Sequence, residues 1–231
     1  MNVIYSDKLK CPQCKCILSS FNEIHRNDLL HFARFLFYQV GQTIFQQGEP
    51  ANHIYMCCSG HLKIAQRTEH GHIRIIRFVH EGQLFGEEAL LNTHQLYMGF
   101  AEAMTPSLVC WLPASVVINI LQSSPNLSLE LIKQLIWHIN ELRESLMVTN
   151  FMISKDRVEQ GILHLCRRYG SETLHGIEIG IEFKESELAQ LIGLPLETTS
   201  RYLSSWKRQG WIIRKGRRWI IPHDSPIIKL K

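Results

Sequence analysis

The sequence predicts an α+β protein with a double-stranded β-roll of the jelly-roll type, a long dimerisation helix and a winged helix-turn-helix. Three observations favour this order of parts. Short apolar segments are punctuated by glycines, a heptad spacing follows, and two short helical patterns then precede a hairpin. We place the roll at residues 20–123, the dimerisation helix at 124–154 and the winged helix at 155–231, after a cysteine-containing arm at 1–19.

The first part has the pattern of short antiparallel strands, from about residue 38 to residue 113. Segments such as HIYMCCSG, HLKIAQRT and IRIIRFV have the pattern of short β-strands and are separated by glycines. Glycines recur between such segments at intervals of 7, 12, 11 and 11 residues, at Gly41, Gly48, Gly60, Gly71 and Gly82. Because glycine readily adopts the positive φ angles of tight turns, this spacing predicts a small barrel or jelly roll.

A heptad spacing follows between Pro125 and Ile153. Residues on this seam are alternately four and three positions apart, at Ile132, Ile136, Ile139, Arg143, Leu146, Asn150 and Ile153. The spacing is typical of a helix that pairs with a second copy of itself, but a helix lying on its own domain has the same period. Arg143 and Asn150 favour the homodimer, because buried polar residues on a seam fix the register of the two helices.

The last part contains two short helices and a hairpin. After the helical pattern of RVEQGILHLCRRYG, the segment SELAQLI predicts a short helix that Gly193 ends. LETTSRYLSSWKRQG predicts a second helix that ends at Gly210. WIIRKGRRWII has two apolar segments around Lys215-Gly216, which predicts a β-hairpin. Two helices joined by a tight turn with glycine, followed by a hairpin, make a winged helix-turn-helix.

The charged residues are unevenly distributed along the chain. Residues 184–231 contain ten Lys and Arg against four Asp and Glu, a net charge of +6, whereas residues 1–183 contain 15 and 17, a net charge of −2. A basic segment beside a nearly neutral body indicates a polyanionic partner such as double-stranded DNA. The sequence has no run of roughly 20 apolar residues and no secretory pattern near its first residues, so we expect a cytoplasmic protein with no membrane partner.

The second helix of the helix-turn-helix carries side chains suited to base edges. In this motif the N-terminal residues of that helix enter the major groove. Glu197, Ser200 and Arg201 lie three and four residues apart and share one face, whereas Leu203 and Trp206 can face the core. Arginine can donate twice to guanine, glutamate can accept from cytosine, and serine can do either. We predict base contacts for the first three residues. Phosphate contacts are predicted for Lys207, Arg208, Arg214, Lys215, Arg217 and Arg218.

This order of parts resembles the CRP/FNR family of bacterial transcription regulators over nearly the whole chain. The stretch GLPLETTSRYL is similar to the FNR branch, whose reading helix carries Glu, two intervening residues and Ser-Arg. The resemblance implies that Glu197, Ser200 and Arg201 read half-sites of the type TTGAT. It also implies a roll like a cyclic nucleotide-binding domain, a homodimer, and recruitment or obstruction of RNA polymerase.

Members of the family respond to different signals, one of which is a cyclic nucleotide. That branch carries Phe-Gly-Glu and, about ten residues later, Arg-Ser or Arg-Thr. Phe85-Gly86-Glu87 is present here, but the expected Arg-Ser position reads Tyr97-Met98. Without that arginine the charge of a cyclic phosphate would be poorly compensated, so cyclic nucleotide sensing is the weaker alternative.

An enzyme is a further alternative, because jelly rolls include the metal-dependent cupins. A cupin site needs His-x-His followed closely by a glutamate and later by another histidine. His70-Gly71-His72 supplies the pair, but the next acid is Glu81, nine residues on. We therefore expect a polar hairpin turn at this position and no enzymatic activity.

Three of the seven cysteines lie close together in KCPQCKCI, at Cys11, Cys14 and Cys16. FNR-type oxygen sensors hold a [4Fe-4S] cluster with three N-terminal cysteines and a fourth in the roll, and the resemblance implies that Cys110 is this fourth ligand. The family's N-terminal cysteines are more widely spread than Cys14 and Cys16. Zinc bound by four cysteines and a thiol–disulfide switch therefore remain open as alternatives. Apolar contexts predict burial in the core for Cys57, Cys58 and Cys166.

Overall fold

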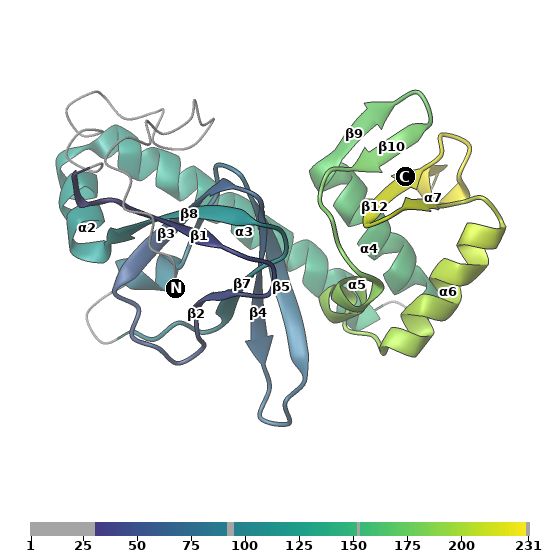
Figure 1. Ribbon diagram of the computed structural model, residues 1–231, viewed down its shortest axis with the longest axis horizontal. Coiled ribbons are helices and arrows are strands. Elements are labelled where there is room, and N and C mark those ends of the chain that lie inside the picture. Colours follow the sequence, from purple (N-terminus) through teal and green to yellow (C-terminus); the bar gives the residue numbers. More distant parts are fainter. Residues whose placement is uncertain (1–30, 92–94, 152, 230–231) are drawn as a thin grey trace. The chain divides into compact units, whose positions relative to one another are not determined.

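The structure is a computed structural model that describes residues 31–91, 95–151 and 153–229 (Figure 1). The chain forms two compact units that divide within a long helix, between His138 and Ile139. The first unit is a β-roll with its covering helices, and the second is a winged helix, in agreement with the predicted fold class. None of the helices in the described ranges combines the length and the apolar composition needed to cross a membrane.

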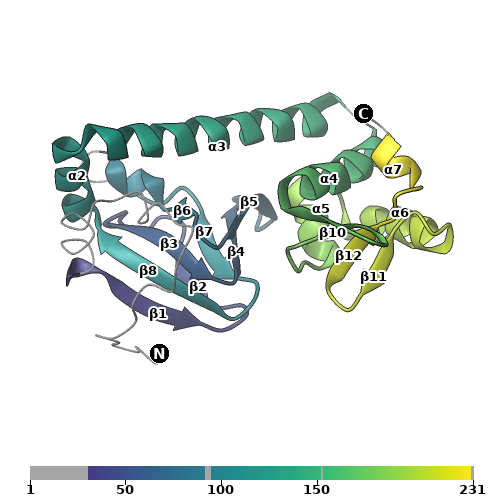
Figure 2. The ribbon, with the colours of Figure 1, turned by 90° about the horizontal axis from the view of Figure 1, so that it is seen from above.

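The β-roll consists of two antiparallel sheets (Figure 2). Strands follow the order β1-β8-β3-β6 in the first sheet and β2-β7-β4-β5 in the second. Their bounds are β1 Arg34–Tyr38, β2 Thr43–Phe45, β3 His53–Ser59, β4 His61–Arg67, β5 Ile73–His80, β6 Leu84–Phe85, β7 Phe100–Ala103 and β8 Ser107–Pro113. A short 3-10 helix, η2 (Glu87–Leu90), follows β6. Except for the β4–β5 hairpin, strands that pair in the roll are not consecutive in the chain, as the predicted jelly roll requires.

The turns of the roll use the glycines that the sequence singles out. All five have positive φ, between 79° and 89°. Gly60, at the β3–β4 turn, shows why another residue would not fit. A Cβ at this position would lie 2.6 Å from the carbonyl oxygen of Pro106, and the φ of 89° is strained for any L-residue with a side chain.

The roll has two apolar layers, and β3 contributes to both. Ile54, Met56 and Cys58 pack in the layer beneath the helices α2 (Ala114–Ser123) and α3 (Pro125–Phe151). Tyr55 and Cys57 pack in the interior between the two sheets. Because successive side chains of a strand point to opposite faces, a central strand covered on both sides is apolar throughout.

The heptad prediction needs one correction at its C-terminal end. Helix α3 ends at Phe151, so Ile153 does not lie on it. Ile153 instead adopts an extended backbone, with φ −66° and ψ 162°, as the N-cap of the next helix. The backbone of the other six seam residues is helical. The spacing of three residues from Asn150 to Ile153 continues in the sequence beyond the end of the helix, but the backbone at Ile153 is no longer helical.

The second unit is a winged helix whose helices and hairpin lie close to the predicted positions. Its elements are α4 Ser154–Tyr169, β9 Gly170–Thr173, β10 Gly176–Ile179, α5 Glu185–Ile192, α6 Leu196–Arg208, β11 Ile213–Lys215, β12 Arg218–Ile221 and α7 Pro226–Lys229. Gly193 ends α5 in the left-handed conformation, with φ 67°, as predicted. The strands form one antiparallel sheet in the order β11-β12-β10-β9, so the unpredicted hairpin β9–β10 extends the wing.

Candidate functional site

Helix α6 is anchored by one face. Thr199, Leu203 and Trp206 are at most 2% exposed, and their spacing of four and three residues places them on a single helical stripe. The hydroxyl of Thr199 also donates to the carbonyl oxygen of Pro195 at 3.1 Å. The prediction that Leu203 and Trp206 face the core is confirmed. Anchoring by this stripe leaves the opposite face of α6 at the surface of the unit.

The three predicted base-reading residues do not have the same environment. Glu197 and Arg201 are exposed near the N-terminal end of α6, one turn apart. Ser200 is half-buried, and its hydroxyl donates a hydrogen bond of 2.6 Å to the carboxylate of Glu185. The acidic and the basic side chain are therefore accessible together, whereas the hydroxyl proton of Ser200 is engaged within the protein.

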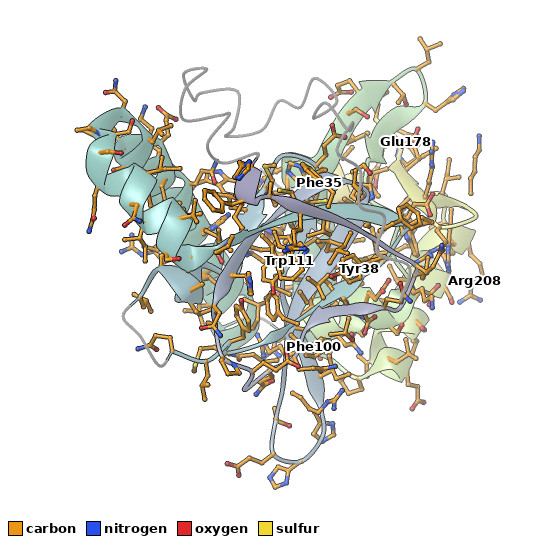
Figure 3. All side chains as sticks on the ribbon, turned by 60° about the vertical axis from the view of Figure 1, so that its left-hand side comes forward. Phe35, Tyr38, Phe100, Trp111, Glu178 and Arg208 are labelled. Carbon is orange, nitrogen blue, oxygen red and sulfur yellow. The ribbon has the colours of Figure 1, made fainter. Side chains whose placement is uncertain are left out.

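The predicted phosphate contacts also fall into two groups. Arg208 and Lys215 are exposed, and Arg208 is labelled in Figure 3. The other four are near carboxylates, at 2.6 Å for Lys207–Glu185, 3.2 Å for Arg214–Glu185, 3.9 Å for Arg217–Glu187 and 3.2 Å for Arg218–Glu178. The Arg218 side chain is nevertheless 64% exposed. An exposed ion pair of this kind is weak, so Arg218 remains available to a phosphate.

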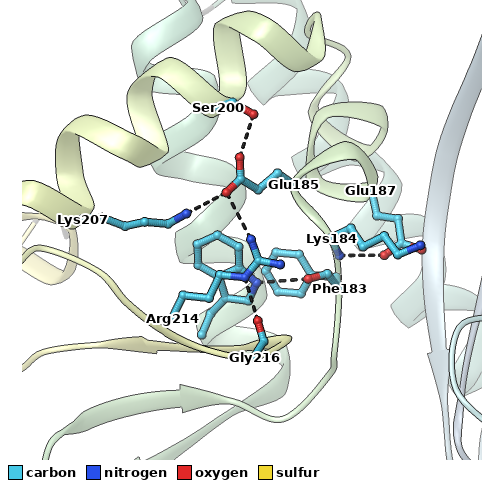
Figure 4. Close-up of polar contacts among 9 residues, drawn as sticks. Phe183, Lys184, Glu185, Glu187, Ser200, Lys207, Arg214 and Gly216 are labelled. Carbon is cyan, nitrogen blue, oxygen red and sulfur yellow. Dashed lines mark hydrogen bonds and ion pairs between the residues drawn. The ribbon is translucent and has the colours of Figure 1, made fainter.

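Glu185, at the start of α5, is the centre of this network (Figure 4). One carboxylate oxygen accepts from Lys207 and Arg214, and the other accepts from Ser200. Burial raises the pKa of Glu185, but hydrogen bonds from Lys207 and Ser200 and the charges of Lys207 and Arg214 lower it. The net pKa lies below its ordinary value, because the positive partners stabilise the ionised form.

Trp219 of the wing supports the two cations that Glu185 binds. The ammonium nitrogen of Lys207 lies 5.0 Å and the guanidinium carbon of Arg214 lies 4.9 Å from the centroid of its ring. The indole N–H donates to the carbonyl oxygen of Phe183 at 3.2 Å, and Trp219 is fully buried. A fixed aromatic face attracts cations, so Trp219 and Glu185 together hold both side chains in place.

Sequence reasoning did not identify Glu185. Its three partners are 15, 22 and 29 residues away in the chain. An acidic residue in the first turn of a helix is common, since it interacts favourably with the helix dipole. The sequence alone thus carried no signal that distinguished Glu185 from an ordinary residue at a helix start.

The interior of the roll is filled by aromatic rings near Phe85-Gly86-Glu87. Tyr97, where an arginine was expected for cyclic nucleotide binding, is 2% exposed and stacks on Phe45 with ring centroids 4.0 Å apart. Its hydroxyl donates to the carbonyl oxygen of His53 at 2.6 Å. Figure 3 shows the side chains of the roll as sticks, with Tyr38, Phe100 and Trp111 labelled. The ring of Tyr97 is thus part of the core.

His70-Gly71-His72 lies in the turn between β4 and β5, where both histidines are exposed. The backbone N–H of Gly71 donates to the carbonyl oxygen of Thr68, and that of Thr68 donates to the carbonyl oxygen of His72, both at 2.9 Å. The prediction of a polar hairpin turn is confirmed.

The predicted cluster ligands are only partly covered by the structure. Cys11, Cys14 and Cys16 lie outside the described residues. Cys110 is fully buried on β8, opposite Phe35 of β1 and Met56 of β3. In the described part of the chain, no group of three or more His, Cys, Asp and Glu side chains is placed to hold a metal ion.

Cys58 is an unpredicted neighbour of Cys110. Both thiols lie in the apolar layer beneath α2 and α3. A hydrogen bond with Cys110, together with burial, raises the pKa of the Cys58 thiol. Burial likewise raises the pKa of Cys166 to about 12, so this thiol stays protonated at neutral pH. The predicted burial of Cys57, Cys58 and Cys166 is confirmed, with exposures of 0, 1 and 6%.

A reading helix with one anchored and one polar face, beside a basic β-wing, defines a DNA-binding module. Comparison with known proteins gives the same result. Residues 35–124 match the family described as cyclic nucleotide-binding domain, and residues 156–225 match the Crp-like helix-turn-helix domain. The chain belongs to the CRP/FNR family, and is a DNA-binding transcription regulator.

Individual relatives cover most of the chain. The fumarate and nitrate reduction regulatory protein of Escherichia coli is 26% identical over 228 residues, which are 96% of this chain and 90% of that protein. The anaerobic regulatory protein of Pasteurella multocida is 26% identical over 192 residues, or 83% and 70% of the two chains. The structure of FixK2 from Bradyrhizobium japonicum has a TM-score of 0.74 at 20% identity and covers 86% of this chain and 97% of its own.

Proposed function

We propose that the protein is a homodimeric regulator of the FNR type that reads TTGAT-like half-sites in double-stranded DNA, with one α6 helix per half-site. The observation that carries this proposal is the exposed pair Glu197 and Arg201. A TTGAT half-site contains one G·C pair. Arginine is the preferred partner of guanine, and glutamate accepts from the amino group of cytosine, so the pair suits that position.

The dimer in this proposal forms through α3. Ile132, Ile136, Ile139 and Leu146 share the heptad seam and are 48–56% exposed. Half-exposed aliphatic side chains in one row favour a helical partner, because pairing with a second copy would remove the whole row from water. A two-fold dimer presents two reading helices about 34 Å apart, which suits a palindrome.

The dimer would regulate transcription in the cytoplasm by recruiting or obstructing RNA polymerase. The name of the Escherichia coli relative, a fumarate and nitrate reduction regulatory protein, supports this regulatory role.

For the signal, we propose a [4Fe-4S] cluster held by Cys11, Cys14, Cys16 and Cys110. Cys110 is suited to be the fourth ligand beside the cysteines of the N-terminal arm. It lies opposite Phe35 of β1, the first strand that follows that arm. When bound, the cluster would supply oxygen-sensitive redox chemistry and would compensate the charge of a buried thiolate at Cys110.

Anaerobic purification tests the cluster. We expect a brown protein containing iron and sulfide, and loss of the colour when Cys11, Cys14, Cys16 or Cys110 is replaced by serine. Cys166→Ser is the matched control, because Cys166 is also buried but lies in the winged-helix unit. A wild-type protein with zinc in place of iron, or a Cys110→Ser variant that keeps the full cluster, would exclude this assignment.

Cys58 and Cys110 belong to the same buried apolar layer, and this proximity supports a second candidate signal, a dithiol switch in the roll. Oxidation would join the two sulfurs and release two protons and two electrons to an oxidant such as a peroxide. Mass spectrometry after alkylation under air distinguishes the candidates, since only the switch yields a Cys58–Cys110 disulfide in a metal-free protein.

A further inference from the structure

Glu185 lies where the reading helix and the wing meet. Its carboxylate accepts from Lys207 of α6 and from Arg214 of β11, and both cations belong to the set expected to contact phosphates. The inference therefore rests on α6 and the wing facing DNA. It does not depend on the sequence of the half-site or on the signal that the protein senses.

The network reduces the positive charge that α6 and the wing present to DNA. One carboxylate is shared by two cations, at 2.6 and 3.2 Å. The three side chains are only 19–29% exposed, so water screens their attraction less than it screens an ion pair at the open surface. A phosphate that binds Lys207 or Arg214 must therefore compete with Glu185. Lys215, at the end of β11, is exposed.

We propose that Glu185 is a specificity-determining residue that withholds Lys207 and Arg214 from DNA of random sequence. Binding to random DNA is driven mainly by neutralisation of phosphates and release of counterions. A duplex that binds without base contacts gains little binding free energy by displacing Glu185 from these cations. When α6 binds its operator, base contacts keep the phosphates close to α6 and the wing. Displacement of the Glu185 carboxylate by a phosphate then becomes favourable. The carboxylate thus widens the gap between specific and non-specific affinity.

The decisive variant is Glu185→Gln, which removes the charge and keeps the size and an acceptor oxygen. We expect its affinity for a random duplex to rise roughly tenfold at about 0.1 M salt. The slope of log affinity against log salt concentration should become steeper by about one for each cation released in each subunit. The ratio of operator to random-duplex affinity should fall. The matched control is Glu172→Gln on β9, which changes the net charge equally at an exposed site outside the network. A Glu185→Gln variant with unchanged or lower affinity for the random duplex would overturn the proposal.

A second comparison substitutes the lysines, first with Glu185 intact and then in the Glu185→Gln background. In the wild type, Lys207→Ala should alter random-duplex affinity less than about threefold, whereas Lys215→Ala should lower it by roughly tenfold. In the Glu185→Gln background the effect of Lys207→Ala should increase towards that of Lys215→Ala. Equal effects of the two lysines in the wild type would contradict the proposal. A wild type with no preference for a TTGAT palindrome would reject the half-site assignment alone, since the predicted changes in random-duplex affinity do not depend on the sequence of the half-site.

Discussion

Arg77 and Glu87 form an ion pair of 2.5 Å inside the first unit, and Nδ1 of His138 lies 3.3 Å from the same carboxylate oxygen. The Glu87 carboxylate therefore joins β5, the start of η2 and helix α3. In the cyclic-nucleotide branch the corresponding Phe-Gly-Glu cassette helps to hold the ligand. Here the glutamate has partners within the protein, and it connects the roll to the helix that carries the proposed dimer seam.

The first prediction follows from this pair and from the packing of Tyr97. Cyclic AMP should not bind, because Tyr97 stands where an arginine would meet the phosphate and its ring stacks on Phe45. A ligand at 100 times its Kd would stabilise the fold by about 2.7 kcal/mol. We therefore expect an unchanged Tm by differential scanning fluorimetry at about 1 mM cyclic AMP. A rise of several degrees would show that the roll has kept a nucleotide site.

The second prediction concerns the pH dependence of the Glu87 pair. Burial raises the pKa of Glu87, but the charge of Arg77 and a hydrogen bond with His138 lower it below its ordinary value of 4.5. A carboxyl with a lowered folded-state pKa contributes stability above its ordinary value, and this contribution is lost as the pH falls through the lowered pKa. Glu87→Gln should destabilise the protein by about 1–3 kcal/mol at pH 7.

Urea unfolding between about pH 7 and pH 3 measures this effect, and the difference between wild type and Glu87→Gln should shrink below about pH 5. Glu81→Gln is the control, since Glu81 is exposed and close in sequence. A difference that is as large at pH 3 as at pH 7 would mean that ionisation of Glu87 is not its cause.

The third prediction concerns the seam. Ile139→Glu should abolish the dimer and operator binding together, because like charges would face each other in an apolar contact at a cost of several kcal/mol. Sedimentation measures the oligomeric state, and far-UV circular dichroism reports whether the roll stays folded. Asn140→Glu adds the same charge at the next, exposed position and should stay dimeric. A dimeric Ile139→Glu variant would place the interface elsewhere.

The fourth prediction separates base reading from phosphate binding. Arg201→Ala should weaken operator binding by about 1–3 kcal/mol and relax the preference at the guanine. Lys215→Ala should weaken binding to every duplex alike and reduce the salt dependence. Fluorescence anisotropy with the operator and with single-base variants measures both effects. Intact base preference in Arg201→Ala would mean that α6 docks differently.

The sequence by itself determined the features that depend on neighbouring residues. The glycine intervals located the turns of the roll, where positive φ excludes most other residues. The apolar period located α5 and α6, and Gly216 marked the turn of the wing. The same local reasoning failed for Ile153, because a spacing of three residues does not reveal that the helix ends at Phe151. It also missed β9 and β10, because strands of four residues carry too few alternations to be recognised.

Only the tertiary structure decided which side chains meet. Glu185 acquires its partners when α5, α6 and β11 pack together, and the nearest of them is 15 residues away in the chain. Cys58 becomes a neighbour of Cys110 because β3 pairs with β8. Such contacts depend on strand register and helix packing, which are set by the burial of the whole apolar surface and not by any local pattern. That is why the sequence alone could name the cations of the reading helix and the wing, while the carboxylate that binds two of them appeared only in the folded chain.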